Sequence, residues 1–166
     1  MPNKNTFEIK PIKELIYKYY SPNEVWLNPF ANNSKYGITN DLDEQYDTDY
    51  HMDALDFLKL FRDKVKNKEI IVDGILYDPP FSPRQVAECY KKLGKTVNMQ
   101  TTQASYWSKH KELISEIVRK DGYVISCAWN SNGIGKKYGF EIVEILLIPH
   151  GGWHNDTIVT VEKKVI

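Results

Sequence analysis

Residues 70–81 read Ile-Ile-Val-Asp-Gly-Ile-Leu-Tyr-Asp-Pro-Pro-Phe. The first eight of these residues, 70–77, form an apolar run that predicts a central, buried β-strand. The next four, Asp78 to Phe81, form a turn that two consecutive prolines make rigid, because proline fixes φ and lacks a backbone donor. Ser82 and Pro83 then provide a helix cap and a first helical residue, which predicts a helix through Leu93. A buried strand leading through a turn into a helix indicates an α/β fold.

The same alternation of strands and helices continues on both sides of this stretch. Helices are predicted at residues 12–20, 54–66, 82–93 and 106–119. Strands are predicted at residues 24–27, 36–39, 50–52, 70–77, 123–128, 140–148 and 157–162. Residues 54–66 carry apolar side chains at helical spacing, whereas the last two strands flank a glycine-containing turn. We therefore expect a mostly parallel sheet with helices on both faces and a C-terminal antiparallel hairpin.

Composition limits the possible functions. The 166 residues suit one domain, with residues 1–20 as an N-terminal arm and helix, and no linker marks a separate target-recognition domain. Lys plus Arg equals Asp plus Glu at 22 each, which argues against a large non-specific DNA surface but permits a local basic patch. Cys89 and Cys127 lack the spacing of zinc ligands, and no metal site is expected. The polar N-terminus and the absence of a long apolar run predict a cytoplasmic protein without membrane contact.

The turn Asp78-Pro79-Pro80-Phe81 carries the chemistry. Backbone carbonyls and the Asp78 carboxylate can accept hydrogen bonds from one amino group. The lone pair of an amino group on a purine ring is delocalised. Acceptors that draw the hydrogens of this amino group out of the ring plane make its nitrogen a better nucleophile. Phe81 offers an aromatic face on which a flipped base can stack. The alternative is that these residues form only a strand-to-helix connection, since Asp and Pro are common in turns.

These residues resemble the catalytic signature [DNS]-P-P-[YFW] of the S-adenosylmethionine-dependent amino-methyltransferases. In particular, the chain is similar to adenine-N6 DNA methyltransferases of phages and mobile elements, over Val25 to Lys163. The resemblance implies the class I, Rossmann-like methyltransferase fold and S-adenosyl-L-methionine as cofactor. It also implies that Asp78 and the carbonyl of Pro79 orient the target amine while Phe81 stacks on the base.

The resemblance also implies a cofactor site. The turn Asn28-Pro29-Phe30-Ala31 stands where the family contacts the amino acid end of the cofactor. Asp41 matches the acid that holds the ribose hydroxyls, and Asp53 matches the acid that reads the adenine. Where the family has glycine, the chain has Asn32-Asn33-Ser34. Asparagine tolerates the left-handed conformation, so the turn can still form. Asn28 in place of aspartate removes a charge that would pair with the cofactor's ammonium group, which predicts weak cofactor binding or a turn that closes differently.

Three loop residues are candidates for substrate binding. Trp129 follows the strand at 123–128 on the ligand side of the sheet, and His154 and Asn155 lie in a polar, aromatic turn between the last two strands. For each loop, a plain connection is the alternative. The expected partner is a nucleic acid, with DNA preferred over RNA, and a partner protein or the loop Lys95 to Ser105 is expected to supply sequence specificity. The competing functions are methylation of RNA at adenine N6 or guanine N2, and a nucleic-acid or partner-binding module that has lost catalysis.

Overall fold

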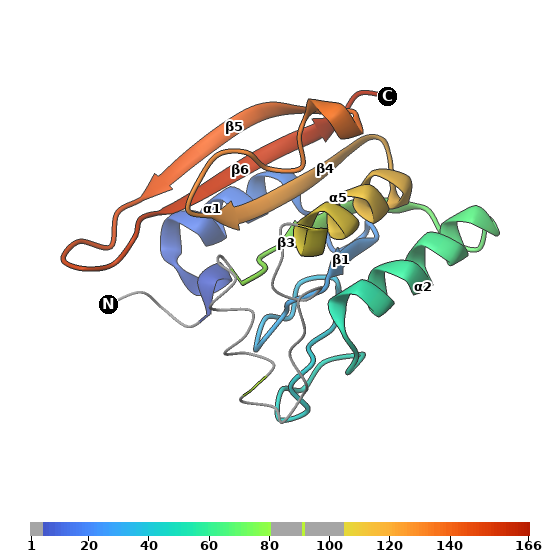
Figure 1. The fold of residues 1–166 in the computed structure, drawn as a ribbon, viewed down its shortest axis with the longest axis horizontal. Helices are drawn as coiled ribbons and strands as arrows, with labels where there is room; N and C mark the ends of the chain where they lie inside the picture. Colours follow the sequence, from blue (N-terminus) through green and yellow to red (C-terminus); the bar gives the residue numbers. More distant parts are fainter. Residues whose placement is uncertain (1–4, 81–90, 92–104) are drawn as a thin grey trace.

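The computed structural model describes residues 5–80, 91 and 105–166. These residues form a six-stranded sheet in the order β2-β1-β3-β4-β6-β5, shown in Figure 1. The strands are β1 (Trp26–Asn28), β2 (Ile38–Thr39), β3 (Val72–Tyr77), β4 (Val118–Ala128), β5 (Phe140–Ile148) and β6 (Thr157–Lys164). The helices are η1 (Thr6–Glu8), α1 (Lys10–Tyr19), α2 (Ala54–Lys66), α5 (Ser105–Ile117) and η2 (Lys136–Tyr138). Phe81, the predicted helix at 82–93 except residue 91, and most of the loop Lys95 to Ser105 lie outside the described residues.

The strand pairing confirms the predicted topology. Strands β2, β1, β3 and β4 pair in parallel, β6 pairs antiparallel with β4, and β5 completes an antiparallel hairpin at the edge. The last strand of the described chain is therefore inserted between β4 and β5. Because the first four strands are parallel, their carboxyl ends lie at one edge of the sheet, where α/β proteins bind ligands.

Two predicted strands differ from the structure. Residues 50–52 form no strand, and Tyr50 makes only an isolated bridge to Asn40. Strand β4 begins at Val118, directly after α5, rather than after the turn at Asp121-Gly122. Asp121 adopts a left-handed φ of 66°, and the pairing of β3 with β4 shifts register near that point. At this point β4 has more residues than the paired stretch of β3, and these residues form an irregularity within β4.

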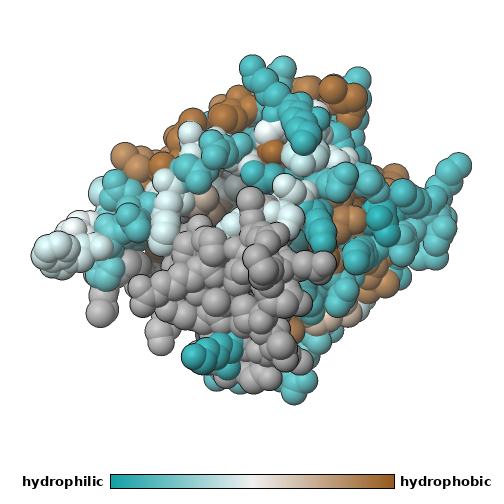
Figure 2. Space-filling model, viewed as in Figure 1, coloured by the Kyte–Doolittle hydropathy of each residue, from teal (hydrophilic) through white to brown (hydrophobic). Residues whose placement is uncertain are grey.

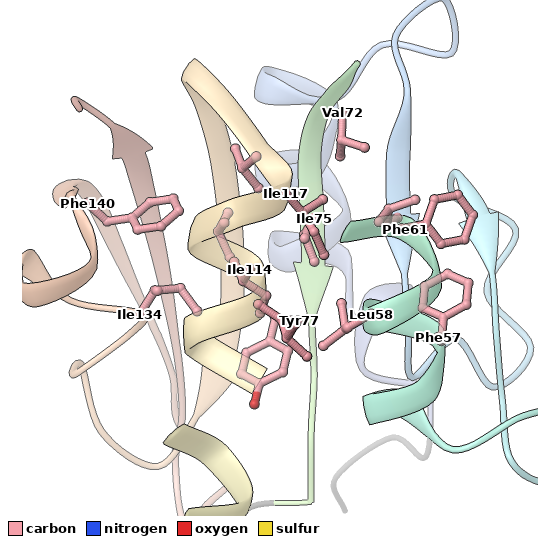
Figure 3. Packing of buried hydrophobic residues seen from close by; sticks show 14 residues of the cluster. Phe57, Leu58, Phe61, Val72, Ile75, Tyr77, Ile114, Ile117, Ile134 and Phe140 are labelled. Carbon is pink, nitrogen blue, oxygen red and sulfur yellow. The ribbon is translucent and has the colours of Figure 1, made fainter. Parts of the chain in front are cut away.

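Helices α2 and α5 cover one face of the sheet. Their apolar residues pack on Ile75 and Val72 of β3 in a buried cluster that Figure 3 shows from close by. Phe57 and Phe61, one helical turn apart on α2, have ring centroids 4.8 Å apart. Ile114 and Ile117 of α5 are fully buried on the same face. Burying each such side chain contributes about 1.5–3 kcal/mol to folding, so this layer stabilises the parallel strands that carry the site.

The other face of the sheet is covered by η1 and α1. Phe7 of η1 and Ile12 and Ile16 of α1 are buried in a second cluster with Trp26 of β1. The Trp26 ring lies directly over Gly74 of β3, where an added β-carbon would be 2.6 Å from three ring atoms. Glycine at this position therefore permits close contact between the Trp26 ring and the backbone of β3.

The edge strand β5 exposes apolar side chains. Ile142, Ile145 and Leu147 pair with residues of β6 yet remain about half exposed. In Figure 2, apolar atoms gather along the margin where Figure 1 places β5. The connection from β4 to β5, residues 129–139, contains only the short helix η2 in place of an α-helix. Among the described residues, no helix is long and apolar enough to cross a membrane.

Candidate functional site

The structure places most of the predicted site residues along one edge of the sheet. Most of them lie at or just beyond the carboxyl ends of the parallel strands, and Asp53 follows the segment in which Tyr50 forms a bridge to Asn40. These residues are Asn28 to Ala31 at the end of β1, Asp41 after β2, Asp53 before α2, Asp78 to Pro80 after β3, and Trp129 after β4. Phe81, the last residue of the predicted catalytic turn, lies outside the described residues.

The turn after β1 is held by the side chain of Asn28. Asn28 is fully buried, and its Nδ2 donates to Ser34 Oγ at 3.0 Å and to the Tyr36 carbonyl at 3.2 Å. Its Oδ1 is buried without a hydrogen-bond partner among the described residues. A buried carbonyl oxygen left unpaired costs free energy, so this atom is a candidate acceptor for a ligand's N–H group.

Asp41 joins the end of β2 to the turn after β1. Its carboxylate accepts hydrogen bonds from the backbone N–H of Asn32 at 2.9 Å and from that of Asp43 at 3.0 Å. Asn32 has a φ of 53°, so the left-handed conformation expected of an asparagine in this glycine-poor turn is present. Burial raises the pKa of Asp41, and the two backbone hydrogen bonds oppose that rise. A carboxylate can accept about four hydrogen bonds, so Asp41 keeps capacity for a ligand hydroxyl.

Asn40 is a site residue that the sequence did not single out. Its Nδ2 donates to the Pro29 carbonyl at 3.1 Å and to the Met52 carbonyl at 2.9 Å, and its Oδ1 accepts from the Met52 N–H at 3.1 Å. The side chain is fully buried. Asn40 therefore fixes the turn after β1 relative to the segment that leads into α2. The only sequence signal was a polar residue at the end of a predicted strand.

Asp53 begins helix α2. Its carboxylate accepts a hydrogen bond from the Leu55 N–H at 2.9 Å, so it is the helix N-cap. Asp at this position satisfies a backbone donor that has no partner within the helix. One carboxylate can cap a helix and still accept from a ligand. The role in reading an adenine that the family resemblance implies for Asp53 stays a prediction.

The Asp78-Pro79-Pro80 turn leaves the end of β3. Pro79 is buried, Asp78 and Pro80 are partly buried, and Trp107 Nε1 of α5 donates to the Pro80 carbonyl at 3.1 Å. Burial raises the pKa of Asp78 to about 7, and a hydrogen bond from the Thr6 side chain lowers it. Trp107 of α5 thus anchors the turn from the face of the sheet that α2 and α5 cover.

An aromatic cluster connects this turn to the turn after β1. Tyr77 Oη lies 2.9 Å from His110 Nδ1, and the Phe30 ring centroid is 6.0 Å from that of Tyr77 and 5.8 Å from that of His110. Burial lowers the pKa of His110 to about 4, so its imidazole is neutral at pH 7. His110 Nε2 has no hydrogen-bond partner among the described residues. No sequence pattern points to His110, which is a lone histidine within an amphipathic helix.

The hairpin loop between β5 and β6 projects from the same edge. Ala128, at the end of β4, pairs with Ile158 of β6, so the loop 149–156 extends beyond the level of Asp78. His154 and Asn155 are exposed there, beside the fully exposed Trp153. A 2.6 Å contact between His150 Nε2 and Thr157 Oγ1 closes the base of the loop. Trp129 is also exposed.

Comparisons with known proteins address the fold. No family model and no curated protein matches the sequence. A provisionally assigned methyltransferase solved with S-adenosylhomocysteine is 13% identical, with a TM-score of 0.54 over 94% of this chain and 49% of that one. TrmN from Thermus thermophilus is 17% identical, with a TM-score of 0.52 over 92% of this chain and 48% of that one. A provisionally assigned methylase from Haemophilus influenzae is 11% identical, with a TM-score of 0.54 over 95% and 98%.

The similarity to these three solved proteins extends over more than nine-tenths of this chain. The chain has the fold of the Rossmann-like methyltransferases. It spans about half the length of the first two solved proteins named above, and nearly the whole of the third. At these identities the likeness establishes the fold, whereas the activity has to be argued from the residues at the site.

Proposed function

We propose that the chain binds S-adenosylmethionine and transfers its methyl group to an exocyclic amino group, N6 of adenine in DNA being the leading substrate. The proposal depends on one observation. A rigid Asp78-Pro79-Pro80 turn follows the central strand of a methyltransferase fold, at the same edge as Asn28 and Asp41. Ligands of α/β folds bind outside this edge.

The residues present fit the cofactor. The buried, unpaired Oδ1 of Asn28 is an acceptor suited to the ammonium group of a bound amino acid. Asp41 is a half-buried carboxylate with capacity for ribose hydroxyls, and Asp53 has capacity for the amino group of an adenine. Phe30, packed against Tyr77, adds an apolar surface between these polar groups. Asn28 carries no charge, so we expect weaker binding than an aspartate at this position would give.

The chain's own residues act mainly by positioning the target amine. S-adenosylmethionine, when bound, supplies an electrophilic methyl group on a sulfonium. The Asp78 carboxylate and the Pro79 carbonyl accept the two hydrogens of the amine, which turns the nitrogen lone pair towards that methyl group. Trp107 holds the Pro80 carbonyl and keeps the turn in place. Such positioning within a contact distance of about 3–3.5 Å supplies a large part of the rate enhancement.

The transfer balances without a metal or redox partner. One N–C bond forms, one S–C bond breaks, and the sulfonium becomes a neutral thioether. The methylated nitrogen loses one proton, which passes to the Asp78 carboxylate and then to water. A carboxyl group whose pKa burial raises to about 7 is suited to accept this proton near neutral pH.

The substrate side of the site is assigned to the exposed loops at the same edge. Trp129 and the hairpin residues His154 and Asn155 are the proposed contacts to the nucleic acid. Trp153, next to them, is fully exposed. An exposed indole can stack on an unpaired base with a free energy of about 1–3 kcal/mol. Specificity for a sequence is expected to need a partner protein or residues beyond those described.

The proposal is tested first by calorimetry with S-adenosylhomocysteine and then by methylation with labelled S-adenosylmethionine on DNA and RNA. Mass spectrometry of the digested nucleosides identifies the modified base. We expect N6-methyladenine in DNA. Methylated adenine or guanine found only in RNA would replace the DNA assignment with the RNA one. Cofactor binding without any methylated base would favour a binding module.

A variant pair connects the activity to the turn. Asp78→Ala is expected to abolish methylation while the affinity for S-adenosylhomocysteine stays within a few-fold. Asp56→Ala, at an exposed position on α2, is the matched control and is expected to retain activity. Equal turnover in the Asp78→Ala variant and the wild type would remove Asp78 from the mechanism.

A further inference from the structure

The residue directly before the catalytic turn carries a buried hydroxyl group. Tyr77 ends β3, and Figure 3 shows its hydroxyl oxygen pointing away from Ile75, in the direction in which the strand runs. A buried phenol needs a hydrogen-bond partner, because it has lost its contacts with water. Within the described part of the chain, this partner is His110 of α5, whose Nδ1 lies 2.9 Å from Tyr77 Oη.

The ring of His110 is enclosed by three other rings. His110 is fully buried, and the ring centroids of Phe30, Tyr77 and Tyr106 lie 5.8, 5.9 and 4.5 Å from its own, each in an edge-to-face arrangement. Its Nδ1 contacts Tyr77, whereas its Nε2 has no hydrogen-bond partner among the described residues. The contact with Tyr77 is therefore the polar interaction that distinguishes the two ring nitrogens and fixes the orientation of the ring.

The same helix also holds the far end of the turn. Trp107, three residues before the histidine on α5, donates from Nε1 to the Pro80 carbonyl at 3.1 Å. Residues three apart lie on the same side of a helix, so both side chains reach the turn from one surface of α5. Asp78 and Pro79 thus lie between two points, Tyr77 and Pro80, that are each hydrogen-bonded to α5.

We infer that His110 is a positioning residue for methyl transfer: its hydrogen bond with Tyr77 fixes the start of the Asp78-Pro79-Pro80 turn on α5, so that the acceptors of the turn face the target amine. This inference rests on the function proposed above. His110 acts through Tyr77 and needs no contact with the cofactor or the substrate. A displacement of about 1 Å at reacting groups can lower a rate about a hundredfold, so this hydrogen bond matters for the turn.

Four variants separate the hydrogen bond from the packing around it. Tyr77→Phe removes the hydroxyl and keeps the ring against Phe30. His110→Asn places an amide group near the position of Nδ1, whereas His110→Gln places one near that of Nε2. Asparagine should therefore keep the hydrogen bond to Tyr77, and glutamine should lose it. Tyr123→Phe is the matched control, because Tyr123 is a partly buried residue of β4 that pairs with Gly74, away from the end of β3.

The first readout is hydrogen exchange of the Trp107 indole N–H, measured by NMR in the protein alone, without cofactor or nucleic acid. This proton reports the hydrogen bond to Pro80 at the far end of the turn. Exchange is expected to be about tenfold faster in Tyr77→Phe and His110→Gln, because a turn released at its start opens more often. His110→Asn and Tyr123→Phe should exchange as the wild type does. Unchanged exchange in Tyr77→Phe would overturn the inference.

The second readout is the separation of kcat from KM. Tyr77→Phe and His110→Gln are expected to lower kcat about tenfold to a hundredfold. The KM for nucleic acid and the affinity for S-adenosylhomocysteine should stay within about threefold, because the interaction is needed in the transition state. His110→Asn should keep most of the wild-type kcat. Equal losses in the asparagine and glutamine variants, or an effect on KM alone, would contradict a positioning role.

The two readouts fail independently of each other. If the His110 variants do not fold, Tyr77→Phe and its control decide the question, since that change removes a single oxygen atom. A wild-type protein that methylates nothing would defeat the proposed function. Exchange of the Trp107 indole in the same protein would still decide whether the pair of Tyr77 and His110 holds the turn.

Discussion

Replacing Asn40 with alanine is expected to destabilise the protein and to loosen the cofactor site together. The change removes three hydrogen bonds of a fully buried side chain, two to the backbone of Met52 and one to the carbonyl of Pro29. Each contributes about 1 kcal/mol net, so the free energy of unfolding should fall by about 3 kcal/mol. For a domain of this size that corresponds to a fall in the melting temperature of about 6–12 °C.

Urea denaturation followed by circular dichroism measures the stability change, and calorimetry with S-adenosylhomocysteine measures the effect on the site. We expect weaker ligand binding, because Asn40 fixes the turn at Pro29 relative to the segment before Asp53. Asn33→Ala is the matched control, since Asn33 is exposed on the same turn, and it should change stability by less than about 0.5 kcal/mol. If Asn40→Ala unfolds at the same urea concentration as Asn33→Ala, the side chain does not connect these segments as described.

Three further changes test other parts of the structure. Burial raises the pKa of Asp78 from 3.8 to about 7, so between these values the folded protein binds more protons than the unfolded chain and stability falls as pH rises. Asp78→Asn should remove most of that decline in urea titrations at pH 5 and pH 8, and parallel declines in both proteins would contradict the assignment. Trp153→Ala should raise the KM for nucleic acid about tenfold, because the stacking of the indole on a base is lost. The melting temperature and the cofactor affinity should not change. An unaltered KM would exclude stacking by Trp153. Gly74→Ala should lower the free energy of unfolding by about 2 kcal/mol, because its β-carbon would overlap the Trp26 ring. Gly151→Ala is the control, because only its positive φ is strained there, and it should lower the free energy of unfolding by about 1 kcal/mol. If Gly74→Ala is as stable as the wild type, the Trp26 ring can move aside and the reasoning is wrong.

Elements with strong local signals could be predicted from the sequence. Helix α2 has the bounds expected from the apolar spacing of residues 54–66, and β5 has those expected for residues 140–148. The predicted strand at 50–52 was wrong because its backbone groups bond partly to the side chain of Asn40 rather than to a neighbouring strand. The start of β4 was misplaced because Asp-Gly normally marks a turn, whereas here it forms an irregularity within a strand.

The candidate site was predicted only in part, because some of its residues act through contacts with residues far away in the sequence. Asp78 and Asn28 could be found because each belongs to a short motif directly after a strand. Asn40 and His110 act through contacts with residues at least 11 positions away along the chain, which no local pattern encodes. The roles of Asp41 and Asp53 towards a cofactor stay predictions that ligand binding has to test.

The insertion of β6 between β4 and β5 has a consequence for how the sheet assembles. Strand β5 reaches the parallel strands only through β6, to which it is joined by the short loop 149–156. A short loop closes at a small entropic cost, whereas pairing β6 with β4 closes a longer one. We therefore expect the hairpin to form early and to join the sheet as a preformed unit. Substitutions in its loop should change the folding rate more than the unfolding rate.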